Sequence, residues 1–479
     1  MVRRRLPSST YYTPAGEPEW SRETFGEQSI AVLSGGYRNP IEMARHVAAR
    51  CDSQQPFFVM DVAAIERRLE AIRVFLPRIR PSYSVACNAD PVLARVLANN
   101  TDVTFEVANS TELELASDHV EPSRAVFCSQ LMTRRAIKTA AAAGCGTFVV
   151  ESEKQMTDVM NASPEAEILL AVCLPYSTGE VPFGCTTEEV EEILDMAHLL
   201  GANVTGIYLE LGVRASLDDY TSAISDARSI FDTASEKFLT LSRVSLGNLV
   251  MPMGSDNICA EFRSFCSALS YSIKELFNGE VEFSANIGRS LVMNAFTLCT
   301  NVIGKRTMDA KFITNDDFDD GIGYVYQTND GVYGSFGCKQ MDINPLCKPL
   351  DAEKASDKST LHFGTILGPS LDRTDVAQRI TRCRQLEVGE WLVWEQMGAF
   401  TIPVESEHPV PPVYYYSGKE CWQKLINKDE QRRSPSPSVS DMEDIGSDGE
   451  GYASSCDDSE AETAMEPLVE EMNEFEESF

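Results

Sequence analysis

The strongest constraint on the fold is a repeated change of hydrophobic period in the first half of the chain. Short apolar runs alternate there with longer amphipathic stretches whose apolar residues follow the helical period. The apolar runs occupy residues 56–62, 82–88, 103–108, 124–128, 147–152, 167–174 and 204–212. Most are apolar throughout rather than at every second residue, which is typical of parallel strands buried on both faces. So many strand–helix units in succession predict an α/β fold built as a (β/α)8 barrel.

The pattern changes after Ala295. Strands rich in aromatic residues and turns follow without helical stretches between them, at 296–306, 323–336 and 389–404. This pattern predicts an antiparallel β domain. We therefore expect four regions: a disordered arm over 1–29, a barrel over 30–295 with an N-terminal strand that contributes to the β domain, the β domain over 296–426, and a disordered acidic tail over 427–479.

The charge of the chain is strongly negative and unevenly distributed. The formal net charge is -32, and the segment from Asp429 onward holds 17 Asp and Glu against two arginines. Such a balance lacks the basic footprint that general nucleic-acid binding requires. The simplest role of the acidic tail is to keep the protein soluble. Control of turnover and a short binding helix near its end are alternatives.

The remaining bulk features indicate a cytoplasmic protein. No run of about 18 apolar residues is present, so we expect no membrane-spanning helix. The first residues, MVRRRLPSSTYYTP, lack the apolar stretch of a secretory signal. The 14 cysteines form no CxxC pair and do not cluster with the five histidines at metal-ligand spacing. We therefore expect free thiols, no metal site and a reducing, cytoplasmic location.

Five strings within this framework resemble the eukaryotic ornithine decarboxylase family, whose members use pyridoxal phosphate. They are YSVACN at 83–88, AISDARSIFD at 223–232, IGR with NAFTL at 287–298, NDGVYGSF at 329–336 and WEQMGAF at 394–400. The strings occur in the family's order, and the resemblance spans about residues 30 to 425. It implies an alanine racemase-like (β/α)8 barrel followed by an antiparallel β domain, with a cofactor site at the mouth of the barrel.

Two positions by which the family controls its cofactor are changed. In YSVACN the family has the lysine that holds pyridoxal phosphate, and this chain has Ala86. A methyl group cannot form that bond, and residues 81–95 contain no lysine. The family's acidic partner of the ring nitrogen corresponds to Asn286, which carries no negative charge to stabilise a protonated ring. The resemblance therefore implies no catalytic residue and no ornithine decarboxylase activity.

Other parts of the family's cofactor site are altered as well. The glycine-rich phosphate turn keeps Gly247 but has Asn248 where another glycine belongs. Glu210 replaces a histidine that stacks on the ring, and Phe400 replaces a tyrosine that contacts the phosphate. Arg289 is retained, and it either still meets an anion or pairs with an acid as a structural residue. We therefore expect no cofactor, with pyridoxal phosphate binding lost or weak.

A remnant of the family's substrate pocket is expected near this site. By the resemblance, Asp342 and Asp372 correspond to substrate-binding acids, and Leu371 replaces an active-site cysteine. Three functions therefore stay open beside a regulatory one. The chain could bind a small amine in the remnant pocket, pair with an active ornithine decarboxylase subunit, or retain a residual decarboxylase activity.

The similarity to inactive relatives known as antizyme inhibitors implies a protein-binding function. These relatives bind antizyme and so release the active enzyme from inhibition. In the family, antizyme docks on a barrel helix and the loop after it, which correspond to about 133–157 here. Arg134, Arg135 and Lys138 form a basic cluster in this segment, and Lys154 extends it. A basic surface facing an acidic partner would steer association and set specificity.

An ordinary solvated helix face explains the same basic cluster equally well. Ala136, Ile137 and the residues 140–143 are expected to form the buried side of this helix, so the basic residues point outward under either interpretation. The helix itself is therefore expected to be structural, and antizyme docking on it is a hypothesis.

Overall fold

The computed structural model describes residues 20–33, 39–50, 54–177, 183–252, 259–277, 279–351, 361–370, 372–405 and 409–433. The chain divides into two units, 1–426 and 427–479. The second unit is described only as far as the end of helix α12 (Lys419–Arg433). None of the helices in these ranges has both the length and the apolar composition that a membrane crossing requires.

Eight parallel strands close into a barrel, which confirms the predicted (β/α)8 architecture. In chain order they are β4 (Ile79–Ser84), β5 (Thr104–Val107), β6 (Ala125–Cys128), β7 (Thr147–Val150), β8 (Glu167–Cys173), β10 (Val204–Leu209), β11 (Arg243–Asn248) and β12 (Glu282–Asn286). The pairings β12–β4 and β10–β8 complete the ring. A two-residue strand, β9 (Cys185–Thr186), pairs in parallel with the end of β8.

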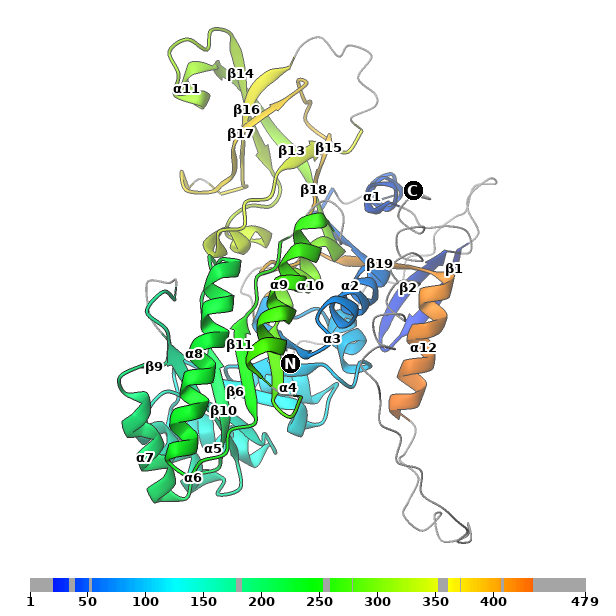
Figure 1. Cartoon of the computed structure of the whole chain (residues 1–479). Helices are drawn as coiled ribbons and strands as arrows, with labels where there is room; N and C mark the ends of the chain where they lie inside the picture. Colours follow the sequence, from blue (N-terminus) through cyan, green and yellow to red (C-terminus); the bar gives the residue numbers. More distant parts are fainter. Residues whose placement is uncertain are drawn as a thin grey trace. The chain divides into compact units, whose positions relative to one another are not determined.

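Helices lie on the outside of these strands, as α8 and α9 do in Figure 1. They are α2 (Val62–Phe75), α3 (Pro91–Ala98), α4 (Ser110–Ser117), α5 (Arg134–Ala142), α6 (Glu153–Ala162), α7 (Val190–Leu200), α8 (Leu217–Glu236), α9 (Ala260–Leu276) and the short α10 (Gly288–Val292). Polar N-cap residues fix where several of them begin. The Thr133 hydroxyl accepts the amide of Ala136 at 3.1 Å at the start of α5, a contact that typically stabilises a helix by about 1 kcal/mol.

The structure also contains a second sheet. Most of its strands follow the barrel in the sequence, as predicted. Its strands are β1 (Trp20–Phe25), β2 (Gln28–Leu33), β3 (Phe57–Asp61), β13 (Phe296–Asp309), β14 (Ile322–Thr328), β15 (Cys347–Pro349), β16 (His362–Leu367), β17 (Val376–Cys383), β18 (Trp391–Trp394) and β19 (Val413–Gly418). Most pairs are antiparallel, while β19 pairs in parallel with β2 and β3, and β14 with β16. The predicted antiparallel domain is therefore confirmed as a mostly antiparallel sheet.

The element boundaries differ from the predicted ranges at three places. The hairpin of β1 and β2 begins at Trp20, inside the predicted arm, because each strand satisfies the backbone of the other. Not one N-terminal strand but three, including β3, join the second sheet. Helix α12 continues past 427 to Arg433, and short helices such as α1 (Pro40–Ala48) and α11 (Lys311–Thr314) occur outside the barrel. The rest of the predicted arm and tail lies outside the described residues.

Hydrogen bonds link the second sheet to the mouth of the barrel. The segment after β18 lies against the short 3-10 turn η1 (Val85–Cys87), which follows β4. The amide of Phe400 donates to the carbonyl of Cys87 at 2.7 Å, and the side-chain amide of Asn88 donates to the carbonyl of Gly398 at 2.7 Å. The turn that carries Ala86 is therefore joined to the segment after β18 by two hydrogen bonds.

Candidate functional site

A buried carboxyl group occupies the floor of the barrel mouth. Glu106, on β5, is 6% exposed. Its two oxygens accept hydrogen bonds from the Ser82 hydroxyl and from the Asn286 side-chain amide, each at 2.9 Å. The side-chain oxygen Oδ1 of Asn286 accepts the backbone amide of Gly288 at 3.0 Å. Both polar atoms of the Asn286 side chain are therefore already hydrogen-bonded within the protein. Burial raises the pKa of Glu106 from 4.5 to about 7.

Glu106 was missed at the sequence level. It lies inside the apolar run at 103–108, where a single acid interrupts a strand that is otherwise buried. An ionisable residue in such a run must be paired or must change its protonation. That interruption was the available signal, and it was overlooked because it matches no motif.

A second carboxyl group, Glu210, lies at the end of β10 and closes the turn that follows β11. Its oxygens accept the amides of Gly212 at 3.0 Å and Asn248 at 3.1 Å. Gly247 adopts a φ of +54°, and a Cβ there would come within 2.8 Å of the Glu210 carboxyl and 2.7 Å of the Leu209 carbonyl. Only glycine fits, and burial raises the pKa of Glu210. The backbone amide of Asn248, which could otherwise bind an anion, thus already donates its hydrogen bond to Glu210.

The three other predicted cofactor-site residues lie apart from these acids. Ala86 is exposed on η1, at the carboxyl end of β4. Phe400 is half-buried with a left-handed φ of +58°. Arg289 is half-buried on α10, where burial lowers its pKa and Cys87 and Asp342 are the nearby groups that oppose this shift. Among the described residues it makes no hydrogen bond or ion pair, so the structural pairing considered for it is not found there.

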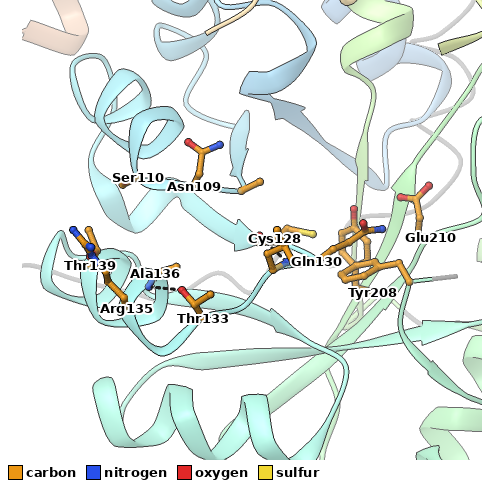
Figure 2. Close-up of a pocket in the computed structure, with 14 residues that line it drawn as sticks. Asn109, Ser110, Cys128, Gln130, Thr133, Arg135, Ala136, Thr139, Tyr208 and Glu210 are labelled. Carbon is orange, nitrogen blue, oxygen red and sulfur yellow. Dashed lines mark hydrogen bonds between the residues drawn. The ribbon is translucent and has the colours of Figure 1, made fainter. Parts of the chain in front are cut away.

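A pocket of about 850 Å³ opens between the barrel mouth and α5. Figure 2 shows Glu210 and Tyr208 at one end and Arg135 and Thr139 of α5 at the other. The rings of Phe183 and Tyr208 meet edge to face at 6.0 Å along its wall. Of the predicted cofactor-site residues only Glu210 lines this pocket, and of the predicted basic cluster only Arg135 does.

The predicted remnant substrate acids are not brought into this pocket. Asp342 accepts from the guanidinium of Arg214, with the Nε contact at 3.0 Å. Asp372 accepts the hydroxyl of Tyr333 and the amide of Thr374, and these hydrogen bonds lower its pKa. Leu371 lies outside the described residues. In the part of the chain that is described, no three His, Cys, Asp or Glu side chains are arranged to hold a metal ion.

The predicted basic cluster lies on the exposed face of α5 and the start of α6. Arg134 donates to Asp158 at 2.8 Å. Arg135, Lys138 and Lys154 are exposed and form no hydrogen bond or ion pair with any described residue. A shallow groove on α5 is lined by Arg134, Arg135, Lys138, Thr139 and Ala142.

The buried side of α5 is narrower than predicted. Ile137 and Ala140 are fully buried, but Ala142 and Ala143 are exposed. The helix is only nine residues long, so two positions about one turn apart are enough to cover the barrel. Because Ala142 and Ala143 are small and exposed, they do not cover the basic side chains of α5.

Comparison with known proteins relates the barrel to a described family. Residues 62–293 match the family described as pyridoxal-dependent decarboxylase, pyridoxal binding domain. The chain is 29% identical to antizyme inhibitor 2 of Xenopus laevis over 414 residues, covering 83% of this chain and 90% of that protein. It is 28% identical to ornithine decarboxylase of Mus musculus over 438 residues, covering 88% and 93%.

Solved structures support the fold. Arginine decarboxylase of Paramecium bursaria Chlorella virus superposes with a TM-score of 0.70 at 22% identity, covering 78% of this chain and all of that one. A lysine/ornithine decarboxylase from Vibrio vulnificus, solved with putrescine, gives a TM-score of 0.67 at 21% identity over 78% and 97%. At these identities the likeness concerns the fold alone.

The expectation that the chain has no cofactor was wrong as stated, because residues 62–293 match a family described as a pyridoxal binding domain and nothing in that match shows a loss of pyridoxal phosphate binding. The expectation rested on single side chains, whereas the match extends over the whole barrel segment. The pocket offers the rings of Phe183 and Tyr208 and the cation of Arg135. These groups fit a non-covalently held aromatic anion. No lysine is among the described residues that line the pocket, so covalent attachment has no partner there.

The raised pKa of Glu106 gives a testable pH dependence. Between pH 4.5 and about 7 the folded chain holds a proton that the unfolded chain has released, so the free energy of unfolding should fall as the pH rises. The change is on the order of 3 kcal/mol. Glu106→Gln keeps partners for Ser82 and Asn286 but cannot ionise. Urea unfolding at several pH values should show a flatter profile for this variant, and an unchanged slope would contradict the assignment.

Proposed function

We propose that this chain, which belongs to the ornithine decarboxylase family of pyridoxal-dependent decarboxylases, is a regulator without decarboxylase activity that binds antizyme. The single observation that carries the inactivity half of this proposal is Ala86 at the carboxyl end of β4. In agreement with it, no described lysine lines the pocket at the barrel mouth. The proposal that the chain binds antizyme rests on Arg135 and Lys138, which are exposed on α5 and unpaired among the described residues.

Three features of the chain's own residues oppose decarboxylase activity. A covalently held pyridoxal phosphate supplies the electron sink that decarboxylation needs. A methyl group at position 86 cannot hold it, and Asn286 is occupied by Glu106 and Gly288. Asp342 and Asp372, the two acids expected to bind a substrate, instead accept hydrogen bonds from Arg214 and Tyr333, respectively. We infer that attachment, ring activation and substrate contact are all impaired.

The proposed partner is an acidic surface of antizyme. The relative named antizyme inhibitor 2 is covered over 90% of its length by this chain. Arg135, Lys138 and Lys154 are exposed cations on a protein whose net charge is -32, and no described residue neutralises them. Unpaired surface cations attract an acidic partner, raise its association rate and disfavour other orientations.

Charge reversal tests the docking surface. The double variant Arg135→Glu and Lys138→Glu should weaken antizyme binding at least about tenfold, because two attractive contacts become repulsive. The matched control is Lys274→Glu with Arg379→Glu, which changes the net charge equally at exposed positions on α9 and β17. Calorimetric titration measures both affinities. Equal losses in the two double variants would show a general charge effect and reject this surface.

Two further measurements test the proposed function. Purified protein should release no carbon dioxide from ornithine, and clear turnover would reject the regulatory interpretation. The cytoplasmic location belongs to the proposal and is checked by cell fractionation. Pairing with an active ornithine decarboxylase subunit stays a prediction, which co-purification of the two chains would test.

A further inference from the structure

Helix α5 presents a basic surface on a strongly acidic chain. Its nine residues, RRAIKTAAA, include three cations and no acid, while the formal net charge of the chain is -32. A groove of about 530 Å³ on this helix is lined by Arg134, Arg135, Lys138, Thr139 and Ala142. Arg135 and Lys138 have no hydrogen-bond or ion-pair partner in the described part of the chain. Their charges are therefore available to an acidic ligand.

The same surface offers apolar contacts. Ala142 is a small, exposed side chain in the groove. Leu131, just before α5, is 80% exposed and lines the adjoining mouth pocket, which shares Arg135 and Thr139 with the groove (Figure 2). Covering an exposed leucine is favourable, because apolar surface leaves water. Cations beside apolar side chains suit an acidic segment that also has an apolar side.

The segment 466–479, EPLVEEMNEFEESF, has this complementary composition. It contains six glutamates and no lysine or arginine. Its large apolar residues recur at the helical spacing i, i+4, i+7 and i+11, at Leu468, Met472, Phe475 and Phe479. Pro467 precedes them, and proline favours the first turn of a helix. The segment lies outside the described residues. Its sequence is that of an acidic peptide that can bind in a groove through one apolar helix face.

We propose that the groove on α5 binds the segment 466–479 of a second copy of this chain, and that this segment and antizyme exclude each other from α5. The antizyme part of this inference rests on the proposed function, and the binding of the segment does not. An acidic segment is repelled by most of a chain with a net charge of -32, so a local positive surface determines where it binds. The glutamates meet Arg135 and Lys138, and the apolar face covers the groove.

The binding of the segment is tested with a synthetic peptide of residues 466–479. Its receptor is the full-length variant with Leu468→Ser, Met472→Ser and Phe475→Ser, whose own segment has lost the apolar face. Fluorescence anisotropy should show reversible binding that weakens at least about threefold when the salt concentration rises from about 0.05 to about 0.3 M. A peptide of the same composition with its apolar residues spread around the helix should bind at least about tenfold more weakly. Equal affinities of the two peptides would reject binding through an apolar face.

Charge reversal locates the site. Arg135→Glu with Lys138→Glu, added to the receptor, should lower the affinity for the peptide at least about tenfold. The matched control is Lys274→Glu with Arg379→Glu, which changes the net charge equally at exposed positions on α9 and β17. Its affinity should stay within about twofold of the receptor, since distant surface charges are screened. Equal losses in the two double variants, or no binding by the receptor, would overturn the assignment of the groove.

The contact between copies is tested by sedimentation velocity over a range of protein concentrations. The wild type should associate more strongly than the variant with three serines and than Arg135→Glu with Lys138→Glu. Identical concentration dependence in all three proteins would reject the contact between copies.

Mutual exclusion is tested by titrating antizyme onto the receptor in the presence of the peptide. At a peptide concentration of about ten times its Kd, the apparent affinity for antizyme should fall about tenfold. The peptide with the scattered apolar residues at the same concentration should have little effect. An unchanged affinity for antizyme in a receptor saturated with the peptide would reject the exclusion. If antizyme does not bind at all, the proposed function fails, while the peptide titrations still decide whether the groove is a binding site.

Discussion

Replacing Gly398 by alanine is expected to lower the free energy of unfolding by at least about 3 kcal/mol. A Cβ at this position would lie 1.7 Å from the carbonyl oxygen of Val292 and 2.5 Å from its carbonyl carbon. Both are backbone atoms, so no change of rotamer relieves the overlap. The Gly398 carbonyl also accepts the Asn88 side chain, and a backbone shift would weaken that link to the barrel mouth.

Gly146→Ala is the control for this substitution. Gly146 lies between α5 and β7, has no left-handed φ, and a Cβ there would meet no atom within 4 Å. Its effect should stay within about 0.5 kcal/mol. Urea unfolding followed by circular dichroism measures both variants. A small effect at Gly398 would show that the segment after β18 can move away from α10, and would remove the argument that it fixes the turn η1.

Introducing a lysine by Ala86→Lys is expected to change covalent labelling from none to nearly complete. Ala86 is exposed at the carboxyl end of β4, so a longer side chain can be added there without overlap with the core. After incubation with pyridoxal phosphate and borohydride reduction, mass spectrometry should find the label on residue 86 of the variant. Ornithine decarboxylation should still be absent, because Asn286 remains committed to Glu106 and Gly288.

The control for this labelling is Ala143→Lys, which adds an exposed lysine at the end of α5, away from η1. It should be labelled no more than other surface lysines. Specific labelling of the wild type at another lysine would be the decisive contrary result. It would mean that a different amine replaces the missing one, and the proposal of an inactive chain would have to be withdrawn.

The barrel was predictable because its strands are buried on both faces and therefore lack polar alternation. The same property made it impossible to predict which sheet residues 57–61 join. β3 is buried at all five positions, as a barrel strand would be, yet it pairs with β13 and β19 in the second sheet. Local composition reports burial but not the neighbour that provides it, so the number of N-terminal strands in the second sheet was underestimated.

The site was predictable only where a single residue decides the chemistry. Ala86 cannot form a covalent bond whatever surrounds it, and its loss was evident from the string YSVACN. Glu106 and Asn286 lie 180 positions apart in the sequence, and only the closed barrel brings them to 2.9 Å. Sequence reasoning therefore assigned a lost charge at 286 without seeing that a buried carboxyl group stands directly beside it.

By itself the sequence determined a resemblance to pyridoxal-dependent decarboxylases, a barrel followed by a β domain, and an alanine at position 86. Each of these follows from residue type and order. Only the tertiary structure decided that Arg135 faces a pocket as well as the surface, and that Glu210 occupies the amide of Asn248. Such facts depend on distances between remote residues, which are set when the barrel closes and its helices pack.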